Sequence, residues 1–275
     1  MNPIITASEL KEQFHSTPYR ILDCRYDLED PGNGRQRYRE GHIPNAVYVH
    51  LDDELCAPVT EHGGRHPLPS LEDMARLFGR LGIERGVTPM VTYDDDGGCF
   101  AARAWWMLRY CGHENVRVLD GGYGAWRDAG GDASIAQPVP VPAGFIPDPQ
   151  ERMRVSMEDV RDRDPDELLM DCRAPERHAG QEEPLDKKAG HIPGAFNVYW
   201  RELVAEDGRF VPIGRAAELL TAVDERSIMH CGSGVTSCVN ILMAERAGLG
   251  TPRLYPGSWS DWISYPDNPV VTEQQ

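Results

Sequence analysis

The strongest chemical signal in this chain is a short loop that reads Cys231-Gly232-Ser233-Gly234-Val235-Thr236. The loop follows the apolar run Ser227–His230 and precedes a helical pattern over Val239–Ala247. A strand is therefore predicted to end at Cys231, with a helix beginning behind a tight turn. Loop N–H groups and a helix N-terminus stabilise negative charge, so they would lower the pKa of the thiol and produce a nucleophile. From these residues alone, a buried structural cysteine is an equal alternative.

Bulk composition excludes several classes of protein. The chain has 275 residues, of which 40% are hydrophobic and 26% charged, and its formal net charge is −16. This length is comfortable for two domains. An acidic surface argues against nucleic acid or an anionic membrane as the main partner. No apolar run is long enough for a transmembrane helix.

The cysteine pattern indicates a reducing compartment. The chain has seven cysteines at irregular spacing and no Cys-x-x-Cys pair, which disfavours a metal site. The segment Met1–Thr6 lacks the basic and apolar regions of a signal peptide. We therefore expect a cytoplasmic protein with reduced thiols and no metal or other cofactor.

The sequence repeats itself over a domain-sized interval. Three ordered matches support this: Asp23-Cys24-Arg25 with Asp171-Cys172-Arg173, Gly41-His42-Ile43-Pro44 with Gly190-His191-Ile192-Pro193, and Gly121–Trp126 with Gly257–Trp262. Each copy should be a whole domain, because the period is too long for a solenoid. We expect domains at 1–132 and 150–275, separated by a proline-rich linker at 133–149.

Both copies alternate short apolar runs with helical patterns. The predicted strands are Arg20–Cys24, Ala46–Val49, Met90–Tyr93, Val116–Leu119, Leu168–Cys172, Ala195–Val198, Arg226–His230 and Arg253–Tyr255. Such alternation predicts an α/β fold with a mainly parallel sheet flanked by helices on both faces of each domain. In such sheets the functional site lies beyond the C-terminal ends of the strands, where Cys231 would lie.

Together, the tandem Asp-Cys-Arg, Gly-His-Ile-Pro and Gly-x-x-x-x-Trp landmarks and the Cys231 loop resemble two-domain rhodanese-type sulfurtransferases, 3-mercaptopyruvate sulfurtransferases in particular. The resemblance implies two rhodanese-like domains and an enzyme that carries sulfur as a persulfide of Cys231. The sulfur would come from 3-mercaptopyruvate or thiosulfate and pass to cyanide or a thiol, with a thioredoxin-like protein as one possible acceptor. Counting back from the tryptophans places Asp95 at the position of Cys231, so the first copy should be catalytically silent.

The same resemblance assigns roles to further residues. The backbone of Gly232, Gly234, Val235 and Thr236 would bind the transferred sulfur, and Arg177 would hold the anionic head of the donor. A second arginine that mercaptopyruvate enzymes usually carry near Glu183-Pro184 is absent, and either Lys187 or Lys188 could replace it. Lysine offers a point charge without the planar fork of arginine.

A relay to Ser233 follows from the resemblance as well. Asp52 would orient His66, and His66 would bond Ser233, so that both domains close the site. The alternatives are a solvent-exposed His66 and a helix-capping Asp52.

Two further hypotheses stay open about activity. The protein could prefer thiosulfate, although the loop lacks the basic side chains that attract a dianion. It could also be a non-catalytic module that binds sulfur or a partner. A cysteine phosphatase is disfavoured because position 237, where such loops carry arginine, is a serine. A monomer is the default expectation.

Overall fold

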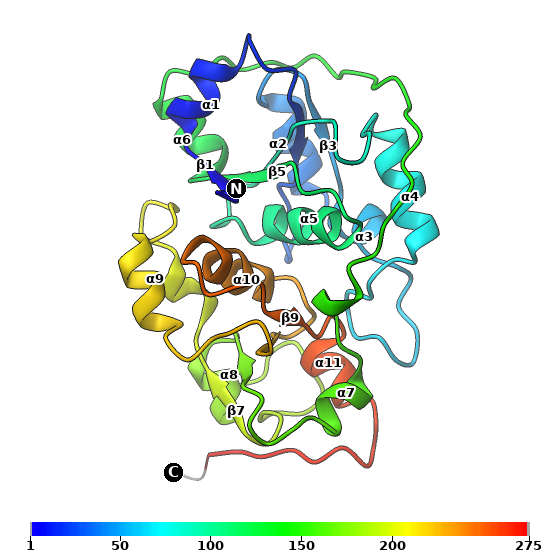
Figure 1. Ribbon diagram of the computed structural model, residues 1–275, viewed down its shortest axis with the longest axis vertical. Coiled ribbons are helices and arrows are strands. Elements are labelled where there is room, and N and C mark those ends of the chain that lie inside the picture. The colour runs from blue at the N-terminus through cyan, green and yellow to red at the C-terminus, as the bar shows by residue number, and fades with distance from the viewer. Residues whose placement is uncertain (1, 274–275) are drawn as a thin grey trace. The chain divides into compact units, whose positions relative to one another are not determined.

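The computed structural model describes residues 2–273, which divide into two compact units (Figure 1). The first unit comprises Met1–Cys56, Pro69–Gln150 and Val204–Phe210. The second comprises Ala57–Leu68, Glu151–Leu203 and Val211–Gln275. The segment Ala57–Leu68 therefore belongs by its contacts to the unit that holds Cys231, although it lies within the first copy of the sequence repeat.

The first unit contains a five-stranded parallel sheet of order β1-β5-β4-β2-β3. Its strands are β1 (Ile4–Ile5), β2 (Arg20–Asp23), β3 (Ala46–Tyr48), β4 (Met90–Tyr93) and β5 (Val116–Leu119). Its helices are α1 (Ala7–Gln13), α2 (Asn33–Glu40), α3 (Leu51–Glu54), α4 (Leu71–Arg80), α5 (Cys99–Tyr110) and α6 (Gly122–Asp128). Every residue of β4 is buried, as expected of a central strand covered on both faces.

The second unit contains a four-stranded parallel sheet of order β7-β6-β8-β9. Its strands are β6 (Leu169–Asp171), β7 (Ala195–Asn197), β8 (Ile228–His230) and β9 (Arg253–Leu254). Its helices are α7 (Met157–Arg161), α8 (Pro175–Ala179), α9 (Ile213–Leu219), α10 (Ser237–Arg246) and α11 (Ser258–Trp262), with short 3-10 turns at Glu151–Met153 and Trp200–Leu203. A single parallel bridge from Arg154 to Leu254 stands where the first unit has β1.

These observations confirm the predicted fold. All strand pairs are parallel, and the central strands β6 and β8 are buried throughout. Apolar side chains from the strands and flanking helices fill each core: Ile5, Leu10, Ile21, Val91 and Trp126 in the first unit, and Val160, Leu169, Ile228, Trp259 and Trp262 in the second.

Local sequence explains where several helices begin. Thr6 and Glu9 form a capping box at the start of α1, and Ser156 and Asp159 form one at the start of α7. The proline-rich segment Ala133–Pro149 contains no helix, because its prolines cannot donate backbone hydrogen bonds.

Candidate active site

The loop at the C-terminal end of β8 surrounds the thiol of Cys231. Strand β8 ends at His230 and α10 begins at Ser237, so the loop occupies the turn between them. Cys231 is only 2% exposed. Its Sγ accepts a hydrogen bond from the backbone N–H of Gly234 at 3.2 Å and another from the Ser237 hydroxyl at 3.5 Å. The sulfur therefore accepts hydrogen bonds from its own loop and from the first residue of α10.

This surrounding lowers the pKa of the Cys231 thiol. Burial acts to raise that pKa, but the hydroxyls of Thr236 and Ser237 and the N–H groups of Ser237 and Ser233 outweigh it. Cys172 shows what burial does without such donors, because burial raises the pKa of its thiol well above the ordinary value. The loop thus provides the stabilised thiolate that nucleophilic chemistry requires.

The two loop glycines differ in whether their backbone tolerates a side chain. Gly234 has φ +75°, and a Cβ there would lie 2.2 Å from the carbonyl oxygen of Pro256. Only glycine fits that conformation and that approach. Gly232 has no such strain, and a Cβ there would meet only the ends of two arginine side chains. Val235 is buried, and Thr236 stands at the N-cap of α10.

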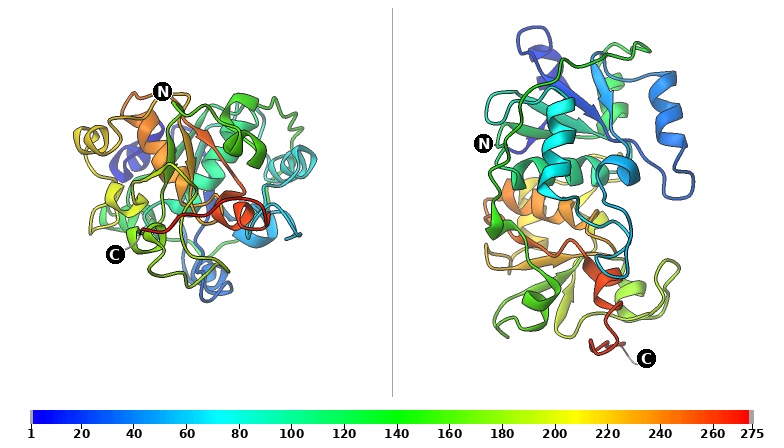
Figure 2. Two further views of the ribbon diagram at one scale, coloured as in Figure 1. Left: turned by 90° about the horizontal axis from the view of Figure 1, so that it is seen from below. Right: turned by 90° about the vertical axis from the view of Figure 1, so that its right-hand side faces the viewer.

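The segment Ala57–Leu68 lies against α11 in the second unit (Figure 2). The backbone N–H of Gly63 donates to Asp261 Oδ1 at 2.7 Å, and that of Arg65 donates to Ser260 Oγ at 3.0 Å. The close approach of Gly64, with φ +79°, to the Gly257 carbonyl leaves no room for a side chain. These contacts hold the backbone of the segment in place at Gly63, Gly64 and Arg65.

His66 and Ser233 meet as the sequence predicts. Both side chains are buried, and His66 Nδ1 lies 2.6 Å from Ser233 Oγ. Asp52 is in α3 of the first unit, where its carboxylate accepts a hydrogen bond from the Tyr26 hydroxyl. The predicted contact between Asp52 and His66 stays a prediction.

A chain of buried ion pairs leads from β6 toward the loop. Arg173 pairs with Asp171 at 2.6 Å and with Glu183 at 3.2 Å. Glu183 also pairs with Arg177 at 2.7 Å, and Arg177 reaches Asp186 at 3.0 Å. Buried charges need such partners. Arg177 is therefore held in place with its Nη1 atom making no hydrogen bond to any residue from 2 to 273.

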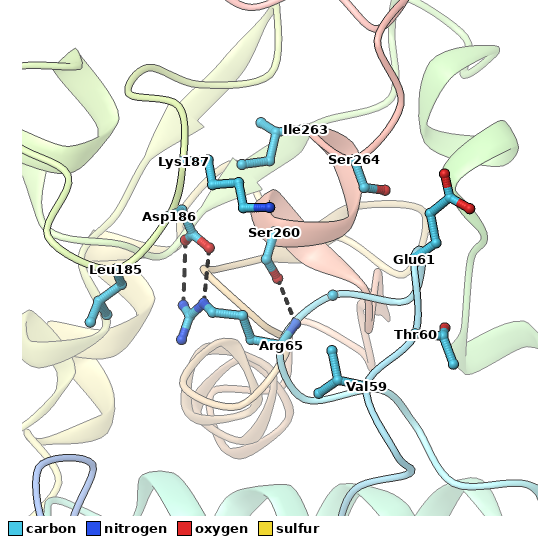
Figure 3. A pocket seen from close by; sticks show the side chains of 11 residues that line it. Val59, Thr60, Glu61, Arg65, Leu185, Asp186, Lys187, Ser260, Ile263 and Ser264 are labelled. Carbon is cyan, nitrogen blue, oxygen red and sulfur yellow. Dashed lines mark hydrogen bonds and ion pairs between the residues drawn. The ribbon is translucent and has the colours of Figure 1, made fainter.

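The chain of ion pairs continues to a residue that the sequence analysis did not select. Arg65 pairs with Asp186 at 2.9 Å, and Figure 3 shows its guanidinium facing that carboxylate. Arg65, Asp186 and Lys187 line a cavity of about 240 Å³, and Cys231 is not part of its lining. Both Lys187 and Lys188 are exposed. No local motif marks Arg65, because its contacts are with residues far along the chain.

The first unit has a corresponding loop after β4, and its register corrects one prediction. Tyr123 N donates to the Asp94 carbonyl at 3.2 Å, just as Trp259 N donates to the Cys231 carbonyl at 3.0 Å. Asp94, not Asp95, therefore occupies the position of Cys231. The alignment was wrong by one residue because the first copy has one more residue between its loop and the shared tryptophan.

An aspartate still occupies the position of Cys231 in the first unit, as expected from the sequence. The Asp94 carboxylate accepts hydrogen bonds from four N–H groups within 2.9 Å, those of Asp96, Gly98, Phe100 and Ala101. Burial raises the pKa of Asp94 to about 6, against these hydrogen bonds. The loop of the first unit therefore encloses its own acidic side chain and offers no sulfur nucleophile at the end of β4.

Comparison with known proteins agrees with this geometry. The sequence profile described as a rhodanese-like domain matches residues 6–129 and 156–265. A protein of Pseudomonas aeruginosa named "Probable 3-mercaptopyruvate sulfurtransferase" is 38% identical over 98% of both chains. The thiosulfate sulfurtransferase of Azotobacter vinelandii is 33% identical over 85% of this chain and 87% of its own.

A solved structure gives the same result. The 3-mercaptopyruvate sulfurtransferase from Leishmania major superposes with a TM-score of 0.82 at 30% identity, covering 94% of this chain and 73% of that one. The chain belongs to the rhodanese-like family and contains two copies of its domain. Among residues 2–273, no helix is long and apolar enough to cross a membrane, and no group of His, Cys, Asp or Glu could hold a metal ion.

Proposed function

We propose that this protein is a sulfurtransferase that takes a sulfur atom from a small anionic donor onto Cys231 and passes it to a thiol or to cyanide. The observation that carries this proposal is the buried Cys231 thiol, whose pKa the loop donors hold below its ordinary value. Relatives that align along most of the chain are named for sulfur transfer. The thiolate is the nucleophilic form of cysteine, so the lowered pKa suits Cys231 to attack a soft sulfur atom.

The proposed cycle has two displacements. The Cys231 thiolate attacks the donor sulfur, and with 3-mercaptopyruvate the carbon–sulfur bond breaks to leave the enolate of pyruvate. That enolate takes a proton, and Ser233 with His66 stands beside the loop to deliver it. An acceptor thiolate then attacks the outer sulfur, breaks the sulfur–sulfur bond and restores the Cys231 thiolate.

The remaining site residues support these displacements. Backbone N–H groups from Gly232, Gly234, Val235 and Thr236 would stabilise the charge on the bound sulfur, as the first unit's loop stabilises a carboxylate. Arg177 would hold the anionic head of the donor. Asp52 would orient His66.

We favour 3-mercaptopyruvate over thiosulfate as the donor. The loop carries only small, uncharged side chains, and the contact between His66 and Ser233 suits protonation of a leaving enolate. Steady-state rates with each donor and cyanide test this preference. A kcat/KM for thiosulfate far above that for 3-mercaptopyruvate would contradict it.

Intact mass spectrometry tests the central step. After incubation with donor, the protein should gain about 32 Da, one sulfur atom, which a reductant removes. Cys231→Ser should show no such gain. Absence of the adduct on the native protein would leave the alternative of a non-catalytic module that binds sulfur or a partner. A cytoplasmic location, a monomeric state and a thiol acceptor such as a thioredoxin-like protein belong to the same proposal.

A further inference from the structure

Ser258 has a backbone conformation that its side chain disfavours. It is the first residue of α11, has φ +56° and is completely buried. Among the non-glycine residues from 2 to 273, only Asn45 also has a positive φ. Asparagine adopts the left-handed region comparatively easily, whereas the Cβ atom of serine makes it unfavourable. Residues held in this way persist only where the surrounding structure maintains them, and they cluster at functional sites.

The hydroxyl of Ser258 bonds the backbone of the nucleophile. Its Oγ accepts a hydrogen bond from the N–H of Cys231 at 3.1 Å and donates to the carbonyl oxygen of Tyr255 at 2.9 Å. Because the single hydroxyl proton is used on Tyr255, a lone pair of the oxygen is available to the N–H of Cys231. Both contacts are buried, so neither group of the backbone can turn to water instead.

This hydroxyl replaces one bond of the ladder between β8 and β9. The two strands pair in register with Met229 opposite Leu254, and the N–H of Tyr255 donates to the carbonyl of Met229 at 3.0 Å. In a regular parallel ladder the next bond would join the N–H of Cys231 to the carbonyl of Tyr255. The Ser258 oxygen bonds both groups instead, so it keeps the nucleophile apart from β9.

The two residues that follow Ser258 hold the same stretch of backbone. The N–H of Trp259 donates to the Cys231 carbonyl, and the N–H of Ser260 donates to the Gly232 carbonyl, each at 3.0 Å. Three consecutive residues of α11 therefore fix the main chain that carries the thiol. The position of Cys231 Sγ relative to its hydrogen-bond donors depends on these contacts.

The first unit has the same conformation without the hydroxyl. Gly122 precedes Tyr123 as Ser258 precedes Trp259, and its φ of +58° matches the +56° of Ser258. A Cβ on Gly122 would lie 1.8 Å from the Asp94 carbonyl oxygen, so no side chain fits there. The turn thus needs only the left-handed conformation, which glycine adopts freely. The hydroxyl is present in the unit that carries the thiol.

We propose that Ser258 is a positioning residue for Cys231, whose hydroxyl separates the nucleophile from β9 so that Sγ meets its loop donors. This inference rests on the proposed function and deepens it. Without the hydroxyl, the N–H of Cys231 would be left unpaired or would close onto the Tyr255 carbonyl. Either change would move Sγ away from the N–H of Gly234 and the hydroxyl of Ser237.

The test compares Ser258→Ala with Ser258→Gly. Both variants lack the hydroxyl, but only glycine relieves the unfavourable φ. The pH midpoint of Cys231 alkylation by iodoacetamide should rise in both by about half a unit, which is a roughly threefold loss of thiolate below the midpoint. Sulfur uptake from 3-mercaptopyruvate should slow about tenfold in both, because the nucleophile is misplaced.

Stability should follow the backbone conformation and not the hydroxyl. Ser258→Gly should unfold at a higher urea concentration than Ser258→Ala, although both have the same chemical defect. A residue that only supports the fold would show chemical losses in proportion to the losses of stability. Native chemistry in Ser258→Gly with a defect in Ser258→Ala would therefore overturn the inference, and so would a native alkylation midpoint in both.

Ser227→Ala is the matched control. It removes another completely buried hydroxyl of the second unit, one that bonds Asp224 and not the nucleophile. Its alkylation midpoint should stay native, and a shift as large as that of Ser258→Ala would also refute the role of Ser258. Alkylation requires no sulfur donor. Failure of the native protein to form the sulfur adduct would refute the proposed function alone and would leave this test of Ser258 intact.

Discussion

The hydroxyl of Ser237 should account for a measurable part of the acidity of Cys231. It donates to Sγ at 3.5 Å from the first residue of α10. A hydrogen bond to a charged group contributes about 1.5–3 kcal/mol, and the length of this one places it at the lower end. Because one pKa unit corresponds to about 1.4 kcal/mol, Ser237→Ala should raise the pKa of Cys231 by about one unit.

Alkylation by iodoacetamide measures this pKa, because only the thiolate reacts. The rate at Cys231 should rise with pH to a midpoint at its pKa, and Ser237→Ala should move that midpoint upward. Ser227→Ala is a matched control, since Ser227 is equally buried in the second unit but bonds Asp224 instead of the thiol. Peptide mapping separates Cys231 from the other six cysteines. An unchanged midpoint in Ser237→Ala would refute the account of the lowered pKa.

Three further predictions concern Gly234, His230 and His66. Gly234→Ala should lower the free energy of unfolding, measured by urea titration, by at least about 2 kcal/mol, because Gly234 has a positive φ and a Cβ there would clash with the Pro256 carbonyl. Gly232→Ala should lower it much less. Equal losses in the two variants would contradict this explanation. Burial lowers the pKa of His230 from 6.5 to about 4. Between these two pH values the free energy of unfolding should therefore fall by about 1.4 kcal/mol for each pH unit of acidification, and His230→Leu should remove that part of the slope. His66→Ala should reduce turnover of 3-mercaptopyruvate more than that of thiosulfate, and parallel losses would argue against proton delivery.

The sequence predicted the longer strands well because each is a short, mostly apolar run, and the central strands β4, β6 and β8 are buried throughout. Strand β1 was missed because it has only two residues, and α2 because its sequence Asn33–Glu40 is almost entirely polar and shows no apolar stripe. By contrast, the helical pattern predicted over Val239–Ala247 corresponds to α10, which spans Ser237–Arg246.

The site was predictable only where chemistry is local. The spacing of the Cys231 loop fixes its turn and its helix, so its role could be read from adjacent residues. Arg65 could not be selected in this way, because its position depends on Asp186 and Ser260, which are far away in sequence. The position of Asp94 was missed by one residue because tryptophan landmarks do not reveal where an extra residue is inserted.

The paired acids of the first unit make the end of β4 unsuited to an anionic sulfur donor. Asp94 occupies the amide cradle, and Asp95 neutralises the arginines beside it. Mutating Asp94 to cysteine alone would place a thiol next to the Asp95 carboxylate, which repels an acidic donor. A single substitution would therefore not give the first unit the chemistry proposed for Cys231, because both acids would have to be replaced.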